Sequence, residues 1–312
     1  MELFASPLLS ASLLGLFVVG YLVLAGADVG LGMLMPHVAR TPEQRQRVVS
    51  AIAPYFLASE VWLVAAVGVM AGMLPDVEHR VVATLCPVLV LLLAAWVMRD
   101  AGLWSRARVD SPGWRSTCDV AIVAGSWLLA ASWGVALAGL LAGELALSPF
   151  TVLCTVAVVS LFALRGAAFG AERLVGAAEA ESADVAARAT RGLARVALAA
   201  ILATAAVAMP LGAAPMVRVE AALVLTVVAV AALGATSGLT GPMLSRHTSA
   251  VAIAVPGLIV ALSADLSVVP LPGMTGVFVW SMLLPAVPVM LLGQVWLYRM
   301  TRRPATEPTF FA

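Results

Sequence analysis

The stretch LLSASLLGLFVVGYLVLAGADVGLGMLM, from Leu8 to Met35, decides the fold class. It contains one charged side chain, Asp28, in a run that is otherwise apolar or small. A helix needs about 20 mostly apolar residues to cross a hydrocarbon core that is about 30 Å thick. The stretch is long enough, and it therefore predicts a transmembrane helix.

The rest of the chain has the same character. Of its 312 residues, 62% are hydrophobic and 11% are charged, whereas a soluble domain carries about 25% charged residues. This composition excludes soluble enzyme classes and predicts an all-α, polytopic membrane helix bundle that forms a single integral membrane domain over residues 1–312. The predicted transmembrane helices are nine: Leu8 to Met35, Ala51 to Leu74, Val81 to Leu103, Thr117 to Leu141, Phe150 to Ala171, Leu193 to Leu211, Val217 to Gly238, Ser249 to Ala264 and Gly276 to Met300.

Arginine is unevenly distributed along the chain. All 18 basic residues are Arg, and cytoplasmic loops retain positive charge during insertion. With the N-terminus outside, the inner loops and inner helix ends hold 16 of the 18, and the outer ones hold only Arg80 and Arg218. The sequence therefore predicts an outside N-terminus, an inside C-terminus, and a helical extension in the inner loop from Gly170 to Gly192. A net charge of +1 gives no basic surface for nucleic acid.

Two carboxyl groups are predicted to lie inside the membrane. Asp28 is in the first helix and Glu60 is in the second, at about 10 and 15 Å from their inner ends. Ionisable groups inside a bilayer are costly, so each is a candidate functional residue. The pair can share or relay a proton; alternatively, each carboxyl only accepts a hydrogen bond from a neighbour such as Ser59.

Other polar and small residues favour structural roles. Gly26 and Gly30 are four residues apart, on one face of the first helix, where they allow another backbone to pack closely. Arg99 and Asp100 lie at the inner end of the third predicted helix, and Asp119 lies at the inner start of the fourth. We expect these three charged residues to form a salt-bridged cluster at the membrane interface.

The histidines and cysteines do not suggest a cofactor site. Haem in membrane bundles is usually held by His or Met side chains that project inward, but the histidines here fall in loops or at helix ends. The cysteines are widely spaced, which suggests neither a disulfide framework nor a zinc site. We therefore expect no cofactor-binding, metal-binding or catalytic residue in this chain. The residues concerned are His37, His79, His247, Cys86, Cys118 and Cys154.

The residues around the two carboxyls carry a family resemblance. The first helix reads GYLVLAGADVGLGML over 20–34, which resembles GYxVLDGFDLGVGML, the first-helix signature of subunit II of cytochrome bd-type quinol oxidases. IAP at 52–54 and EVWL at 60–63 resemble the family's IxPxWDGNEVWL. Further matches to the family's WR…WD…GS run are Arg99, Trp114, Arg115, Asp119, Gly125 and Ser126. The strong matches cover roughly the first 130 residues.

The resemblance implies a place in a respiratory complex of a prokaryotic plasma membrane. In that family, a partner called subunit I holds haems b and d, oxidises quinol and reduces dioxygen to water. Subunit II holds no haem; it stabilises subunit I and is thought to supply a cytoplasmic proton route through carboxylates of its first two helices. Asp28 falls on the second Asp of the family's DGFD, and Glu60 falls on the Glu or Gln of NEVWL. Binding of a quinone by this chain is compatible with apolar grooves between helices, but no residue pattern marks a site.

The sequence also departs from the family pattern. Ala25 stands in place of the first Asp of DGFD, Leu57 stands in place of the Asp of WDGN, and the polar segment before the last helix is reduced to Ser267–Thr275. Proton hopping needs donors or waters about 3 Å apart, and neither Ala25 nor Leu57 provides one. Two alternatives to a proton-conducting subunit therefore stay open: a structural membrane subunit without proton traffic, and a polytopic transporter in which Asp28 and Glu60 line a substrate path.

Overall fold

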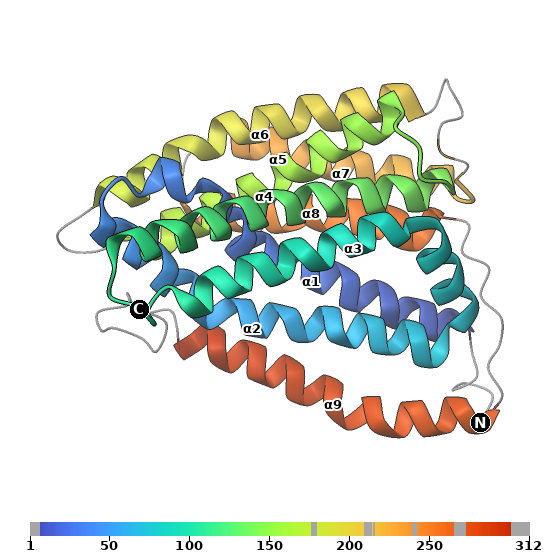
Figure 1. Ribbon diagram of the computed structural model, residues 1–312. Helices are drawn as coiled ribbons and strands as arrows, with labels where there is room; N and C mark the ends of the chain where they lie inside the picture. Colours follow the sequence, from blue (N-terminus) through green and yellow to red (C-terminus); the bar gives the residue numbers. More distant parts are fainter. Residues whose placement is uncertain are drawn as a thin grey trace.

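The computed structural model describes residues 7–175, 180–208, 214, 216–238, 242–264 and 273–300. In this part of the chain every regular element is an α-helix, and each of the nine helices is long and apolar enough to cross a membrane. The predicted all-α membrane bundle is thereby confirmed (Figure 1). The helices are α1 (Pro7–Val38), α2 (Pro42–Met73), α3 (Pro75–Ser105), α4 (Pro112–Ala142), α5 (Pro149–Arg173), α6 (Ala180–Ala208), α7 (Val219–Gly238), α8 (Pro242–Ser263) and α9 (Gly273–Met300).

Helices α2 and α6 begin furthest before the predicted residue. Helix α2 begins at Pro42 rather than Ala51, and α6 begins at Ala180 rather than Leu193. In both cases the additional turns are polar, so the apolar pattern marks the membrane-spanning part and misses the part of the helix outside it. The predicted helical extension in the inner loop is confirmed from Ala180 onward. Most of the predicted turn at 212–215 and of the segment 267–275 lies outside the described residues.

The residues at the helix N-termini explain where most of the helices begin. Six of the helices, α1 to α5 and α8, begin with proline. The fixed φ of proline suits the first helical position, and an N–H at that position would have no partner within the helix, so its absence costs nothing. Thr41 caps α2, because its hydroxyl accepts a hydrogen bond from the Gln44 N–H while the Gln44 side chain accepts one from the Thr41 N–H. This capping box fixes α2 at its polar end.

The helices form two antiparallel four-helix groups. Helices α1 to α4 pack on one another in a ring, and α5 to α8 form a second ring. The groups meet mainly where α1 packs against α5 and α8, and where α4 packs against α5. Helix α9 lies at the edge, beside α2, and bends near its middle (Figure 1), where Pro285 and Pro288 interrupt its hydrogen bonds.

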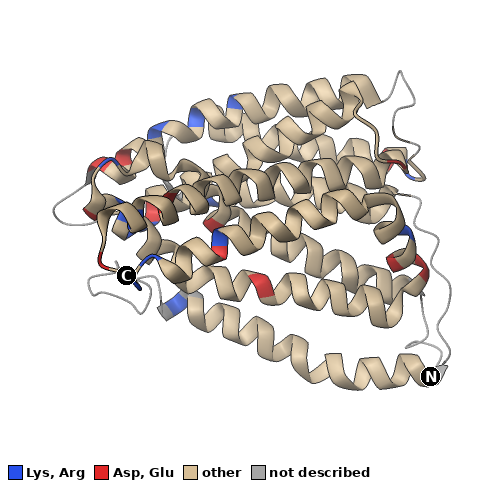
Figure 2. Cartoon of the chain, viewed as in Figure 1, with Lys and Arg blue, Asp and Glu red and all other residues tan. Residues whose placement is uncertain are grey.

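Charged residues gather at one end of the molecule. Figure 2 shows most of the arginines at the end where α1 finishes and α2 begins, and few at the opposite end. We call the first of these the arginine-rich end. Between the two ends, the charged residues of α1, α2 and α3 are Asp28, Glu60, Arg99 and Asp100.

Candidate functional site

A buried ion pair joins α1 to α3. Arg99 Nη2 donates to Asp28 Oδ2 at 2.9 Å, and both side chains are almost completely buried, with exposed fractions of 2% and 0%. Two neighbours complete the carboxylate's surroundings. The Val29 N–H donates to Asp28 Oδ1 at 2.8 Å, and the Ser59 hydroxyl lies 3.3 Å from Asp28 Oδ2. Burial of two charges is tolerated only when such partners are present.

The guanidinium of Arg99 also contacts a second carboxylate. Its Nη1 donates to Asp100 Oδ1 at 3.2 Å, whereas its buried Nε has no hydrogen-bond partner among the described residues. Gly125 of α4 lies against the Arg99 backbone and Cβ, so closely that a Cβ at this glycine would collide with α3. The close approach of α4 to α3 therefore encloses Arg99.

Glu60 lies between this ion pair and the edge of the helix bundle. Trp96 Nε1 of α3 donates to Glu60 Oε1 at 2.8 Å, and the Asp100 carboxyl, one turn along α3 from Trp96, lies close to Glu60. Glu60 is partly exposed, and its neighbours along α2, Leu57 and Val61, are 46% and 48% exposed. The Glu60–Asp100 pair thus lies at the edge of the bundle, while Asp28 lies inside it.

An apolar layer separates the ion pair from the arginine-rich end. Each helix of the first group places a fully buried apolar side chain about one turn closer to that end: Leu31, Phe56, Leu103 and Ile122, with exposed fractions of 0%, 0%, 1% and 0%. Ala25, where the family has an acid, is also buried, at 1%. Among the described residues, Asp100 and Glu60 extend the polar contacts of the ion pair toward the edge of the bundle.

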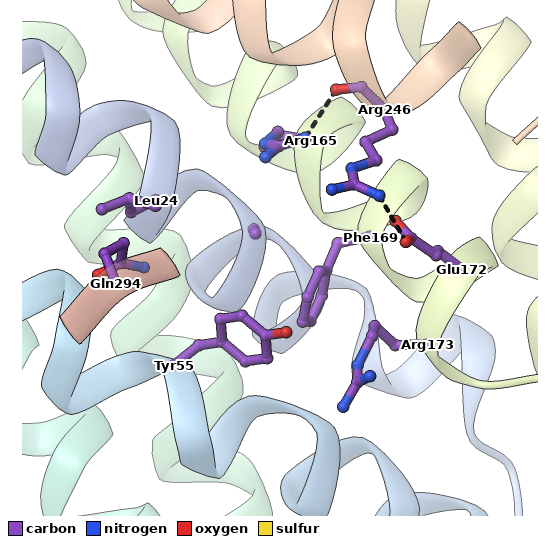
Figure 3. Close-up of a pocket in the computed structure, with 9 residues that line it drawn as sticks. Leu24, Tyr55, Arg165, Phe169, Glu172, Arg173, Arg246 and Gln294 are labelled. Carbon is purple, nitrogen blue, oxygen red and sulfur yellow. Dashed lines mark hydrogen bonds and ion pairs between the residues drawn. The ribbon is translucent and has the colours of Figure 1, made fainter. Parts of the chain in front are cut away.

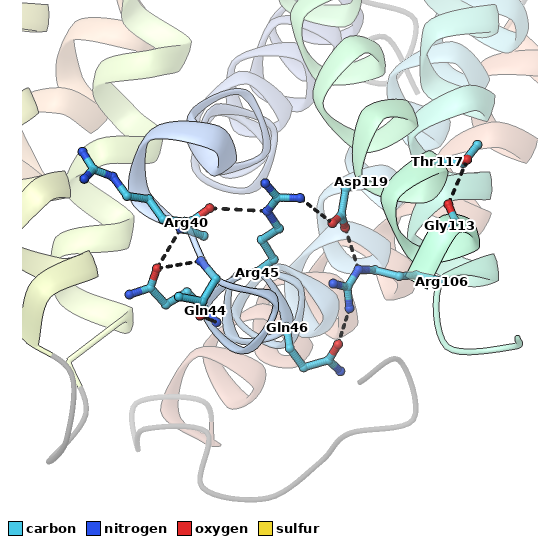
Figure 4. Close-up of polar contacts among 10 residues, drawn as sticks. Arg40, Gln44, Arg45, Gln46, Arg106, Gly113, Thr117 and Asp119 are labelled. Carbon is cyan, nitrogen blue, oxygen red and sulfur yellow. Dashed lines mark hydrogen bonds and ion pairs between the residues drawn. The ribbon is translucent and has the colours of Figure 1, made fainter. Parts of the chain in front are cut away.

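The predicted cluster of Arg99, Asp100 and Asp119 is wrong in one respect, because Asp119 belongs to a second network. Arg106 Nε donates to Asp119 Oδ1 at 2.6 Å, and Arg45 Nη1 donates to Asp119 Oδ2 at 3.4 Å (Figure 4). The reason is the antiparallel register of α3 and α4. Gly125 is level with Arg99, so Asp119, nearer the start of α4, is level with residues beyond Arg99 on α3.

Replacement of Asp119 with Asn is expected to lower the free energy of unfolding by about 1–2 kcal/mol, because it weakens two hydrogen bonds to charged groups, one of them partly exposed. The measurement is the thermal midpoint of the purified protein. Asp110→Asn is the matched control, since that side chain is 94% exposed and pairs only with Arg115 among the contacts described. An equal shift for both variants would contradict the structural role of Asp119.

Gly26 and Gly30 both face neighbouring helices. A Cβ at Gly30 would collide with the Phe162 carbonyl and the Gly166 N–H of α5, and one at Gly26 would collide with Ile253 of α8 and approach Arg165. The α1 and α5 backbones thus cross in contact at Gly30 and Gly166. We propose packing as the role of both Gly26 and Gly30.

The remaining candidate ligands are dispersed. His37, His79 and His247 are exposed and lie near the ends of α1, α3 and α8. The cysteines are free thiols. In the described ranges, no three His, Cys, Asp or Glu side chains are grouped in a way that could hold a metal ion.

Sequence reasoning missed Trp96 and Arg165. Trp96 is four residues before Asp100, so the two side chains share a helix face, and that spacing was the available signal. Arg165 lies in the apolar part of α5, where it donates to the Val23 and Arg246 carbonyl oxygens at 3.2 and 2.8 Å. An arginine within an apolar run is itself a signal for a buried polar contact.

Comparison with known proteins agrees with this architecture. "Probable cytochrome oxidase subunit 2" of Haemophilus influenzae is 32% identical over 166 residues, which cover 48% of this chain and 44% of that protein. "Cytochrome bd-I ubiquinol oxidase subunit 2" of Escherichia coli K12 is 28% identical over 181 residues, covering 53% and 48%. The chain thus spans about half the length of these curated relatives.

The matches to a solved structure and to a family model cover more of the chain than these two alignments do. The solved bd oxidase of Geobacillus thermodenitrificans has the same fold, with a TM-score of 0.66 over 94% of this chain and 98% of that one, at 15% identity. The family model described as "Cytochrome bd terminal oxidase subunit II" matches residues 6–301. The chain, a multi-pass protein of a prokaryotic plasma membrane, therefore belongs to the cytochrome bd terminal oxidase subunit II family.

Proposed function

We propose that this chain is the non-haem subunit of a quinol:oxygen oxidoreductase complex, bound to a haem-bearing subunit I that carries haems b and d. The observation that carries the proposal is the family match over residues 6–301. In such a complex, quinol is oxidised and dioxygen reduced to water on the partner, and this chain stabilises it within the bilayer. The arginine-rich end then faces the cytoplasm, as the positive-inside rule requires.

The histidines of this chain are not placed to hold a haem. Its three histidines are all exposed, near helix ends, whereas an axial ligand must project into a pocket large enough for the porphyrin. The haems of the proposed complex accordingly belong to the partner. Purification of the complex tests this assignment: we expect the chain to be isolated with a second helical subunit and with b- and d-type haem absorption. A purified complex without any haem would refute it.

We also propose that Glu60 and Asp100 hold the exchangeable proton of this chain. Asp28, Asp100 and Glu60 surround one guanidinium, that of Arg99. If all three carboxyls were ionised, the group would carry two uncompensated negative charges inside the membrane, which is costly. Arg99 pairs with both Asp28, at 2.9 Å, and Asp100, at 3.2 Å. Asp28 has the shorter ion pair and is the more deeply buried, so we place the proton on the Glu60–Asp100 pair at the edge of the bundle.

Replacement of Glu60 with Gln in the assembled complex is expected to lower oxygen consumption and coupled proton uptake by about a hundredfold, the lower end of the range for loss of a proton-transfer group. The amide keeps the size and can still accept the Trp96 hydrogen bond, but it cannot carry the proton. Asp28→Asn tests the inner carboxyl in the same assay. Oxygen electrode and pH-electrode recordings on proteoliposomes give both quantities.

The matched control for this experiment is Asp110→Asn, an exposed carboxylate at the arginine-rich end. We expect it to leave both rates unchanged. If Glu60→Gln and Asp28→Asn also leave them unchanged while haem content and assembly stay normal, the chain is a structural subunit without proton traffic.

A further inference from the structure

A long apolar groove runs along one face of α1, beside α8 and α9. It has a volume of about 740 Å³, within the range of about 300–1,000 Å³ that is typical of small-molecule sites. On α1 its lining reaches from Leu8 to Leu24, which is about 24 Å at about 1.5 Å per helical residue. At the inner end, Leu24 and Gln294 also line a second, smaller pocket, and Figure 3 shows the two side chains next to each other.

The helices around the groove leave a space that their side chains do not fill. Helices α1 and α8 approach closely beneath it, since a Cβ at Gly15 would lie 3.2 Å from the Ala261 Cβ. On the α2 side, the Trp62 ring packs directly on Gly20. Helix α9 packs mainly against α2, so it stands beside α1 and α8 without closing the groove between them. A space of this size within the hydrocarbon region needs an occupant, because protein interiors are close-packed.

An arginine lies at the end of the groove that is opposite the arginine-rich end. Arg218 and Val217 both line the groove and directly precede α7. They are fixed to the end of α8, because the Val217 N–H donates to the Ser263 carbonyl oxygen at 2.9 Å and the Ser263 hydroxyl donates to the Arg218 carbonyl oxygen at 3.1 Å. The Arg218 side chain is exposed, and within the described ranges its guanidinium makes no hydrogen bond or ion pair. It is therefore available to a ligand in the groove.

The lining matches a ligand with one acidic group and a long apolar chain. Besides Arg218, the described lining residues are apolar or small except for Ser12, Trp62 and Gln294, and none of them is acidic. Arg218 directly precedes the membrane span of α7, so it lies at the level of the lipid headgroups. A phosphate group accepts paired hydrogen bonds from a guanidinium. A quinone, whose headgroup is neutral, would leave this charge without a partner.

We propose that the groove binds a phospholipid whose phosphate contacts Arg218 and whose acyl chain lies along α1. One leaflet of the hydrocarbon core is about 15 Å deep, half of about 30 Å, so a groove of about 24 Å accommodates a chain through the full leaflet. The bound chain fills the space between α9 and the α1–α8 pair. It thereby gives α9, which packs mainly on α2, a second contact with the bundle.

The first test measures the lipid that stays bound to the protein when it is purified, as it assembles, from membranes of phosphatidylethanolamine and phosphatidylglycerol. Native mass spectrometry is expected to detect retained phospholipid on the unmodified protein. Arg218→Gln is expected to retain about fivefold less, the effect of one basic side chain near an anionic group. Arg218→Lys keeps the charge and should retain the lipid. Arg80→Gln is the matched control, since Arg80 is also exposed and lies at the same end of the molecule.

A second variant blocks the groove and leaves its charge unchanged. Ser12 is exposed and lines the groove, so Ser12→Phe places a ring where the acyl chain would lie. We expect this variant to retain less phospholipid than the unmodified protein. Ser281→Phe is the matched control, because Ser281 is an exposed serine of α9 that is not among the described lining residues of the groove.

A titration of the delipidated protein identifies the ligand independently of the variants. Dioctanoyl phosphatidylglycerol is expected to raise the thermal midpoint at concentrations about fivefold lower than dioctanoylglycerol, which has the same chains and no phosphate. Equal effects of these two compounds, or equal retention of phospholipid by Arg218→Gln and the unmodified protein, would overturn the proposal. Retention of a quinone in place of phospholipid, or stabilisation by inorganic phosphate alone, would also refute a phospholipid site.

Discussion

Replacement of Arg99 with Gln is expected to lower the free energy of unfolding by about 3–5 kcal/mol, the range measured when one partner of a buried ion pair is removed. Asp28 would then keep its place among buried side chains without its guanidinium partner. Its remaining donors, the Val29 N–H and the Ser59 hydroxyl, cannot compensate a full charge. The measurements are the yield of folded protein and the thermal midpoint after purification.

A double replacement separates the ion pair from simple loss of packing. Asp28→Asn combined with Arg99→Gln removes both charges at once, so it is expected to be more stable than Arg99→Gln alone. Arg191→Gln, which removes an exposed arginine of α6, should leave the midpoint unchanged. If the double variant were as unstable as the sum of the single variants, the two side chains would not interact, and the ion pair would not explain the burial of Arg99.

The number and kind of the helices were predictable from the sequence because the membrane imposes one requirement, a sufficiently long apolar run. The same requirement identified Asp28 and Glu60, since acids stand out in such runs. The start of α2 was not predictable in this way. Residues 42–50 form helix without an apolar stretch, and what fixes them is the Thr41 capping box.

The partners of the charged residues were less accessible to sequence reasoning. The places of Arg99 and Asp119 at the inner ends of successive helices suggested that the two belong together at the interface, but helix rotation and the register of α3 against α4 decide the contacts. Arg99 points inward to Asp28, and Arg106, which directly follows the last residue of α3, reaches Asp119. A sequence gives the spacing of residues within a helix; the rotation of each helix about its axis depends on how all its neighbours pack.

The crossing of α1 and α5 leads to the second large expected effect. Gly30→Ala is expected to destabilise the protein by about 3 kcal/mol or more, at the upper end of the range for overpacked sites. The added methyl group would occupy the space of the Phe162 carbonyl and the Gly166 N–H. Both of these are backbone groups, so a change of side-chain rotamer cannot relieve the collision. The two four-helix groups must move apart at this point, and the thermal midpoint measures the cost.

Gly234→Ala is the matched control for this substitution. Gly234 also lies within an apolar helix, α7, but a Cβ there would have no other atom within 4 Å. Because alanine favours the helix by up to about 1 kcal/mol over glycine, we expect this variant to be as stable as the unmodified protein or more so. Gly166→Ala should reproduce the loss seen with Gly30→Ala, since it adds a methyl group to the other side of the same crossing. If Gly30→Ala and Gly234→Ala had equal midpoints, α1 and α5 would not be in backbone contact, and the two groups of helices would have to be held together elsewhere.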